Sequence, residues 1–172
     1  MRKIRYGVAM SLDGYIAGPN GEADWIVIDS DVNFAELWAQ FDTLLMGRRT
    51  SQAAIARLGE TSFQGRKTFV VSRTLRQADY PEVTILSELS RDWLKALCAQ
   101  SGKDIWLMGG GELFRLLLEM GAVDTVEVSV IPVLLGGGVP LLPPPGKQTK
   151  LTLSSHRIYR SGLASLIYAI QH

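Results

Sequence analysis

The chain has 172 residues, a length that is typical of one domain and sufficient to bury a hydrophobic core. Apolar residues make up 47% and charged residues 20%, which is ordinary globular usage and excludes extensive disorder. A formal net charge of +1 argues against a general nucleic-acid or membrane-surface binder. We therefore expect residues 1–172 to form a single domain. Because the sequence shows neither a signal peptide nor a membrane-spanning apolar run, we expect it in the cytoplasm.

Strand-like and helix-like segments alternate through the first half of the chain. In chain order, we expect a strand at 4–10, a turn-rich segment at 11–21, a helix at about 32–40, a strand at 43–46, a helix after Thr50 and a strand at 67–72. Ser30 or Asp31 is the candidate N-cap of the helix at 32–40. That helix would place Phe34, Leu37 and Trp38 on one face.

The alternation continues in the second half. In chain order, we expect a strand at 83–86, a helix at 90–99, a strand at 104–108, a glycine turn and a helix, a strand at 125–131, a loop around 136–146, and strands near 151–159 and 163–170. Residues 160–162, Arg-Ser-Gly, indicate a hairpin between the last two strands. The pattern predicts an α/β fold with a mostly parallel central sheet flanked by helices and a C-terminal antiparallel hairpin. Such sheets bind ligands at the carboxyl ends of their strands.

The strand at 43–46 runs into Gly47, Arg48, Arg49 and Thr50 at the start of a helix. A helix N-terminus presents unpaired N–H groups and a positive dipole end, which favour phosphate. The arginines supply forked donors to an anion, and Thr50 can cap the helix or bind a phosphate oxygen. The alternative interpretation is an ordinary capped helix with two solvated arginines.

Three other strand ends carry glycine or polar residues. The glycines at 109–111 allow a backbone to approach a pyrophosphate, although they also suit a simple tight turn. Ser72 and Arg73 lie at the end of a β-branched strand, where an ordinary polar strand end is the slightly favoured interpretation. Asp13 lies in a loop of small residues, where Asp-Gly is also a common turn pair.

Three of these four strand ends offer groups that bind anions, which indicates an extended ligand with more than one phosphate. A dinucleotide fits such a ligand better than a simple mononucleotide does, and the absence of the Walker A sequence argues against an ATPase or kinase of that class. His156, His172 and Cys98 provide neither a nucleophile–base pair nor a metal-ligand spacing. Hydride transfer is compatible with this lack of catalytic histidine and cysteine motifs, because a cofactor carries the chemistry and the protein supplies position and electrostatics.

Four motifs follow one another as they do in the dihydrofolate-reductase-like superfamily, which the chain resembles: VAMSLDGYIAG, LLMGRRT, GRKTFVVSRT and IWLMGGGELF. The SLDGYIA loop and the late LLGGGVPLL segment are more similar to the riboflavin-biosynthesis branch, which includes the C-terminal reductase domain of a bifunctional deaminase/reductase. The zinc-deaminase pattern is absent, so the resemblance is to a stand-alone reductase. It implies a three-layer fold, NADPH as cofactor and a homodimer.

The resemblance also assigns residues to parts of NADPH. Those residues are Gly47, Arg48, Arg49 and Thr50 for the phosphates, Ser72 and Arg73 for the adenosine, Gly109, Gly110 and Gly111 for the pyrophosphate, and Ala9, Ile16 and Ala17 for the nicotinamide. One arginine would hold the 2′-phosphate. A cis Gly-Gly peptide is usual at the glycine turn of this family.

Two carboxylates are candidates for the catalytic proton donor. The riboflavin branch implies Asp13, whereas folate reductases imply a carboxylate at the first helix, where Asp31 competes with Asp29. Capping bonds would keep Asp31 ionised, so we favour Asp13, shielded from water and tuned toward neutral pH. Trp25 is either a pocket wall or a core aromatic.

The expected function is NADPH-dependent reduction of a small heterocyclic substrate, with the ribosylaminouracil phosphate intermediate of riboflavin synthesis as the named candidate. Dihydrofolate reduction and a non-catalytic NADPH-binding module are the alternatives.

Overall fold

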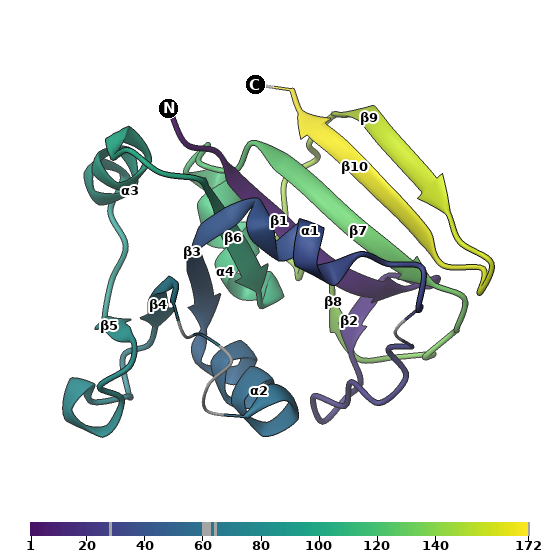
Figure 1. The fold of residues 1–172 in the computed structure, drawn as a ribbon, viewed down its shortest axis with the longest axis horizontal. Coiled ribbons are helices and arrows are strands. Elements are labelled where there is room, and N and C mark those ends of the chain that lie inside the picture. Colours follow the sequence, from purple (N-terminus) through teal and green to yellow (C-terminus); the bar gives the residue numbers. More distant parts are fainter. Residues whose placement is uncertain (28, 60–62, 64, 172) are drawn as a thin grey trace.

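The structure is a computed structural model that describes residues 1–27, 29–59, 63 and 65–171 (Figure 1). Its strands are β1 (Ile4–Ser11), β2 (Tyr15–Ala17), β3 (Phe41–Gly47), β4 (Lys67–Val71), β5 (Thr84–Leu86), β6 (Asp104–Gly109), β7 (Thr125–Ile131), β8 (Val139–Pro140), β9 (Leu151–Ile158) and β10 (Ala164–Ile170). Its helices are α1 (Phe34–Ala39), α2 (Arg48–Leu58), the 3₁₀ turn η2 (Gln77–Asp79), α3 (Arg91–Ala99) and α4 (Gly111–Glu119). None of the described helices has the length and apolar content that crossing a membrane requires.

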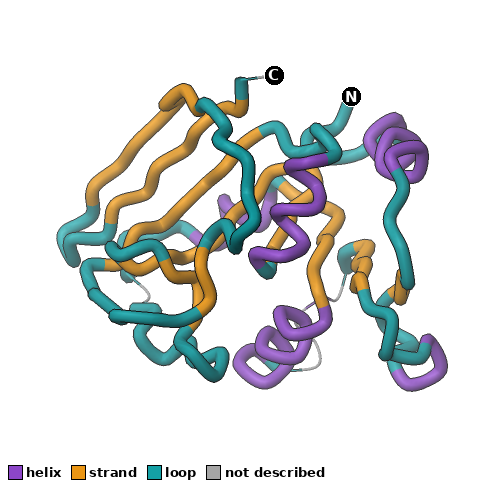
Figure 2. Tube along the Cα trace, turned by 180° about the vertical axis from the view of Figure 1, so that it is seen from behind, coloured by secondary structure: helices purple, strands orange, loops and turns teal. Residues whose placement is uncertain are grey.

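The main sheet has eight strands in the order β5-β4-β3-β6-β1-β7-β10-β9. β10 is antiparallel to both of its neighbours, whereas the other neighbouring pairs are parallel. Figure 2, seen from behind, shows the β9–β10 hairpin at one end of the sheet and the short strand β5 at the other. The predicted mostly parallel sheet with a C-terminal antiparallel hairpin is therefore confirmed. The carboxyl ends of β1, β3, β4, β6 and β7 meet at one edge.

Two apolar cores cover opposite faces of the sheet, because successive side chains of a strand alternate between faces. The first core packs α3 and α4 on one face, and its fully or nearly fully buried members include Ile4, Tyr6, Leu97, Leu107 and Leu117. The second core lies on the other face, where α1 and α2 contribute partly buried side chains to residues such as Leu44, Met46 and Val70. The molecule thus has three layers, helix, sheet and helix.

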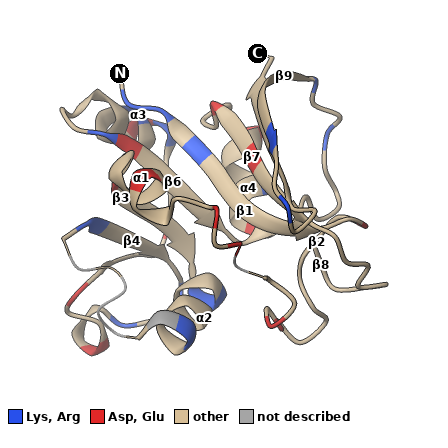
Figure 3. Ribbon diagram, turned by 45° about the vertical axis from the view of Figure 1, so that its right-hand side comes forward, with Lys and Arg blue, Asp and Glu red and all other residues tan. Residues whose placement is uncertain are grey.

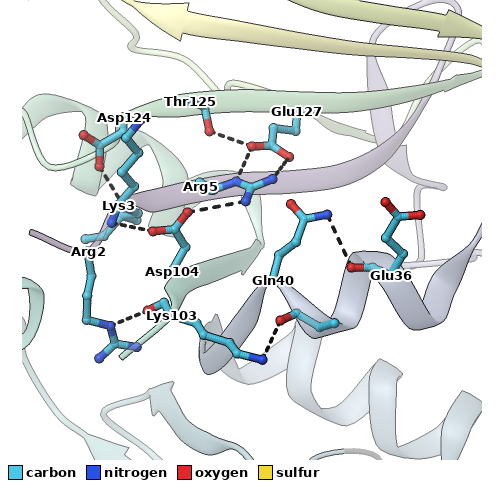
Figure 4. A network of polar contacts seen from close by, with 12 residues as sticks. Arg2, Lys3, Arg5, Glu36, Gln40, Lys103, Asp104, Asp124, Thr125 and Glu127 are labelled. Carbon is cyan, nitrogen blue, oxygen red and sulfur yellow. Dashed lines mark hydrogen bonds and ion pairs between the residues drawn. The ribbon is translucent and has the colours of Figure 1, made fainter. Parts of the chain in front are cut away.

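Arg5 forms an ion-pair network with Glu127 and Asp104 on the face of the sheet that carries α1. Arg5 of β1 donates from Nε and Nη2 to Glu127 Oε1 and Oε2 at 2.6 and 2.9 Å, and its Nη1 reaches Asp104 Oδ2 at 3.4 Å (Figure 4). The guanidinium also lies 4.6 Å from the ring centroid of Phe41. Burial acts to lower the pKa of Arg5, but Glu127 and Asp104 outweigh burial and raise that pKa. Arg5 is therefore a paired structural cation.

The cap of α1 differs from the prediction. The N-cap residue is Asn33, whose Oδ1 accepts a hydrogen bond from the backbone N–H of Glu36 at 3.0 Å. The prediction that Ser30 or Asp31 caps this helix is therefore wrong, because the chain enters the helix two or three residues later. Phe34, expected on the buried face, is 40% exposed.

A second, two-stranded sheet forms where turns and a loop were predicted. β2 pairs with β8 in antiparallel orientation, and the N–H of Leu141 donates to the carbonyl of Gly14 at 2.9 Å. The strands are three and two residues long, which is too short for a periodic pattern to reveal them.

The edge strand β9 is exposed along all eight of its residues. Leu151, Leu153 and Ile158 are 41%, 48% and 65% exposed, respectively. A long edge strand with exposed apolar side chains is a template for pairing with another chain unless it is covered.

Candidate functional site

Two glycine turns meet at the carboxyl edge of the sheet. Gly47 ends β3 and Gly109 ends β6, and these strands are neighbours, with Met46 opposite Gly109. A Cβ atom built on Gly47 would stand 3.7 Å from the backbone nitrogen of Gly110 and 3.8 Å from the carbonyl oxygen of Gly109. The structure therefore brings together the two motifs that the sequence predicts to bind phosphates.

Two helices begin at this junction. Gly47 is the N-cap of α2 and Gly110 is the N-cap of α4, and neither cap supplies a side-chain hydrogen bond. No described side chain caps the first-turn N–H groups of these two helices, which carry the positive ends of two helix dipoles. Thr50 Oγ1 lies 3.7 Å from the Cβ position of Gly110. The Gly109–Gly110 peptide is cis, as the family resemblance implies.

An arginine cluster lies beside this junction. Arg48 at the start of α2 donates from Nη1 to Thr74 Oγ1 at 2.9 Å, which joins α2 to the segment after β4. Arg49 and Arg73 are exposed in the same region, and Figure 3 shows basic residues along α2. Ser72 is buried, and its Oγ accepts from the backbone N–H of Thr74 and Leu75 at 3.2 and 3.1 Å. Ser72 therefore shapes the turn that presents Arg73.

Gly111 is constrained by packing. Its Cβ would lie 2.7 Å from the carbonyl oxygen of Pro140 and 2.9 Å from Cδ of Pro143. The same segment contains Gly138, whose Cβ would meet the carbonyl oxygen of Ala17 at 2.1 Å and which has φ +146°. Residues 138–143 thus link the glycine turn to β2, which carries Ile16 and Ala17, and this explains how distant predicted residues come to one edge.

The sheet opens between β1 and β6 near Ala9. Pairing of β1 with β6 ends at Tyr6 opposite Leu107, whereas pairing with β7 continues to the end of β1. The N–H of Ile105 donates to the carbonyl of Lys3, so odd-numbered residues of β1 direct backbone groups toward β6. The N–H and C=O of Ala9 therefore face this opening.

Asp13 is held by the loop that follows β7. Its Oδ1 accepts from the hydroxyl of Ser11 at 2.6 Å and from the N–H of Leu135 at 3.1 Å, and its Oδ2 accepts from the N–H of Gly136 at 2.7 Å. The Ser11 hydroxyl, followed by these N–H groups, lowers the pKa of Asp13. Asp13 is also exposed. The expectation of a shielded carboxyl tuned toward neutral pH is wrong, because three donors stabilise the ionised form.

Asp29 and Asp31 play different roles in the segment before α1. Asp29 is 8% exposed and accepts from the N–H of Asp31 at 2.8 Å and of Ser161 at 3.3 Å. The Ser161 side chain and the Asp31 N–H lower the pKa of Asp29. The exposed carboxylate of Asp31 has no hydrogen-bond partner among the residues that the structure describes. Asp31 therefore does not cap α1, and the argument that capping keeps its carboxyl ionised does not apply.

The segment carrying these carboxylates is tied down at two places. Asp29 attaches it to the β9–β10 turn at Ser161, and Arg57 of α2 donates to the carbonyls of Ala23 and Ile26 at 3.0 and 3.2 Å. Trp25 is half-buried in this segment and donates its indole N–H to the carbonyl of Glu22 at 3.0 Å.

Sequence reasoning missed Gly7 and Trp106. The indole N–H of Trp106 on β6 donates to the carbonyl of Gly7 on β1 at 2.9 Å. The available signal was a glycine inside a strand, which often marks a close approach of another group.

Comparison with known proteins places this fold in a class. Residues 2–165 match the family model described as the RibD C-terminal domain. The uncharacterized protein YyaP of Bacillus subtilis is 31% identical over 97% of this chain and 94% of its own length. The riboflavin biosynthesis protein RibD of Mycobacterium tuberculosis is 28% identical over 79% of this chain and 44% of its own length. A putative riboflavin biosynthesis protein from Shewanella sp. superposes with a TM-score of 0.83, 25% identity and 99% coverage of each chain.

The fold and the glycine-lined edge define an α/β protein of the RibD reductase-domain type. The chain belongs to the RibD C-terminal domain family, and the match covers nearly all of it.

Proposed function

We propose that the protein is an NADPH-dependent reductase of this family. The observation that carries the proposal is the junction of Gly47 and Gly110, where two helices without side-chain caps begin beside an arginine cluster. Such a junction suits a pyrophosphate, because N–H groups and helix dipoles both favour negative charge. Arg48, Arg49 and Arg73 would hold the 2′-phosphate through charge-assisted hydrogen bonds. The residues present therefore fit NADPH.

The nicotinamide would lie at the opening between β1 and β6. Ala9 would pair its N–H and C=O with the carboxamide, and Ile16 and Ala17 of β2 would line the ring, since the 138–143 segment holds β2 at this edge. When bound, NADPH supplies a hydride from its nicotinamide. The protein itself binds and orients both partners, excludes water and provides a proton.

Asp31 is the proposed proton donor. Hydride addition to a C=N or C=O carbon places negative charge on the nitrogen or oxygen, which must accept a proton from an acid within reach. Asp13 was favoured from the sequence, but its three hydrogen bonds stabilise the carboxylate and make it a loop anchor. Asp31 precedes α1 and has a carboxylate free of described hydrogen bonds, so it takes over this role in the proposal.

The substrate class is a small heterocycle. The candidate is 5-amino-6-(5-phosphoribosylamino)uracil, because the relatives from M. tuberculosis and Shewanella are named as riboflavin biosynthesis proteins.

The active form is proposed to be a homodimer. The exposed Leu151, Leu153 and Ile158 lie on the edge strand β9, and a second copy of the chain would cover them and pair with the strand. Light scattering after gel filtration should give twice the mass of one chain, 18.9 kDa. Leu153→Lys should shift the protein toward monomer.

Two measurements test the function. Calorimetric titration should show NADPH binding with an affinity well above that for NADH, and NADPH absorbance should fall when the aminouracil phosphate is added. Dihydrofolate, supplied in parallel, separates the riboflavin-type from the folate-type activity. NADPH binding without turnover of either heterocycle would contradict the catalytic assignment, and absence of NADPH binding would contradict the whole proposal.

A further inference from the structure

Trp106 occupies the space of a side chain on the neighbouring strand. A Cβ atom on Gly7 would lie 2.7 Å from Nε1 of Trp106 and 3.4 Å from its Cδ1 and Cε2 atoms. The indole N–H also donates to the carbonyl of Gly7 at 2.9 Å. The glycine therefore lets the indole lie across β1, and the indole becomes the surface of the sheet at that point.

The indole is held in place by other aromatic rings. Its centroid lies 4.8 Å from that of Trp38 on α1, at an interplanar angle of 59°, and 5.1 Å from that of Phe41, at 32°. Trp106 remains half-buried despite these contacts. Because its N–H is engaged by Gly7, it offers a neighbour only its π surface and ring edge.

This indole lies next to the proposed hydride-transfer site. Gly7 and Ala9 are two residues apart on one strand, so their side-chain positions share a face and are separated by about 7 Å. The register places Glu127 opposite Gly7, and that carboxylate is bonded to Arg5. The carboxylate opposite Gly7 is thus already paired, and the indole itself presents an aromatic surface to a ligand there.

We infer that Trp106 is a specificity-determining residue of the reductase, whose indole contacts a planar heteroaromatic substrate ring beside the nicotinamide. This inference rests on the proposed function, because it takes the position of the nicotinamide at Ala9 from there. Recognition at this wall depends on a flat ring and not on a particular pattern of hydrogen bonds, since the indole has no free donor. The substrate class is accordingly a planar ring such as an aminouracil or a pterin.

Substitutions at both positions test the inference. Trp106→Leu should raise KM for the aminouracil phosphate by about 10-fold, the scale of one aromatic contact, with NADPH affinity changed less than about twofold. Trp106→Phe should restore part of the loss. Gly7→Ala leaves the tryptophan in place but moves its indole, and it should raise KM in the same direction. Trp93→Phe, where the ring packs against Phe69 on the other core, is the matched control and should change neither constant.

A binding readout covers the case of slow or absent turnover. Folate added to the NADP⁺-bound protein should quench tryptophan fluorescence, and Trp106→Leu should remove most of this quenching while Trp93→Phe retains it. Absent quenching, quenching unchanged in Trp106→Leu, or KM unchanged in both Trp106→Leu and Gly7→Ala would overturn the inference while NADPH binding still supports the proposed function. If Trp106→Leu does not fold, KM and fluorescence quenching of Gly7→Ala test the inference instead. Failure of the unmutated protein to bind NADPH would instead remove the proposed function, and this inference with it.

Discussion

Gly47 and Gly110, which are distant in the sequence, lie close enough that a Cβ on the first would touch the backbone nitrogen of the second at 3.7 Å. The contact exists because β3 and β6 are neighbours in the sheet and both end at the same edge. Two helix N-termini consequently meet at one point, and the arginines that follow Gly47 lie beside it.

Arg48 should decide the preference for NADPH over NADH. Removal of one charge-assisted contact to the 2′-phosphate costs about 1.5–3 kcal/mol, which is roughly a 10- to 150-fold loss of affinity. Arg48→Ala should therefore weaken NADPH by that factor and leave NADH nearly unchanged by calorimetry. Lys95→Ala on α3, which also removes one exposed positive charge, is the control. Equal affinities of the unmutated protein for both cofactors would contradict the assignment.

Gly110 and Gly111 should respond differently to alanine. A Cβ on Gly110 meets Thr50 Oγ1 at an ordinary 3.7 Å, and its φ of −76° suits any residue. Gly110→Ala should therefore fold normally but lose at least about 10-fold in NADPH affinity, because the methyl group faces the proposed pyrophosphate. Gly111→Ala forces a methyl group against Pro140 and Pro143 and should lower the melting temperature. Thermal unfolding with and without NADPH separates the two effects, and tight binding by Gly110→Ala would show that the turn is only structural.

Asp31 and Asp13 should differ in their effect on turnover. Asp31→Asn removes the proposed acid and should lower kcat by about 100-fold or more, with NADPH affinity unchanged. Asp13→Asn should mainly destabilise the loop at Leu135 and Gly136, because the amide can satisfy fewer of its three donors. Steady-state kinetics and urea unfolding of both variants make the comparison. A large loss of kcat in Asp13→Asn without a loss of stability would show that Asp13 in the SLDG loop, and not Asp31, is the proton donor.

Asp13 and Asp29 should contribute to stability in a pH-dependent way. Hydrogen bonds lower the pKa of both carboxyls in the folded protein, so the unfolded chain takes up protons first as the pH falls. Their contribution is complete above the unfolded value of about 4 and is lost as the pH falls through the folded values. The urea midpoint should therefore drop as the pH falls below about 4. Asp29→Asn should flatten that dependence, and an unchanged profile would count against the role of Asp29 at Ser161.

Glu127 should matter more for stability than any exposed ion pair. Its side chain is 12% exposed and that of Arg5 is 14% exposed, so Glu127→Ala removes the main partner of a largely buried cation. The expected loss is about 3 kcal/mol in the free energy of unfolding. Glu112→Ala breaks a pair with Arg115 in which the Glu112 side chain is 71% exposed, and it should cost clearly less stability. Urea denaturation gives both values, and equal losses would show that burial of the Arg5 pair is not what matters.

The sequence by itself determined the strands of the main sheet and the glycine turns, because these depend on local periodicity and on backbone freedom at residues such as Gly109, which has φ +110°. It also determined which strand ends carry arginine and hydroxyl groups, and the parallel sheet then brings those ends together. The cap at Asn33 escaped prediction, because several residues before α1 have side chains that can cap a helix.

Only the tertiary structure decided the roles of individual side chains. Asp13 became a loop anchor because Leu135 and Gly136, in the loop after β7, donate hydrogen bonds to it. No local sequence pattern predicts donors that are so distant in the chain. Trp106 became part of the surface at Gly7 because β1 and β6 are paired neighbours. The indole comes from β6, and Gly7 of β1 leaves the space that it fills. The sequence gives the chemical type of each side chain, but hydrogen bonds and packing between remote segments determine which of those side chains remain available to a ligand.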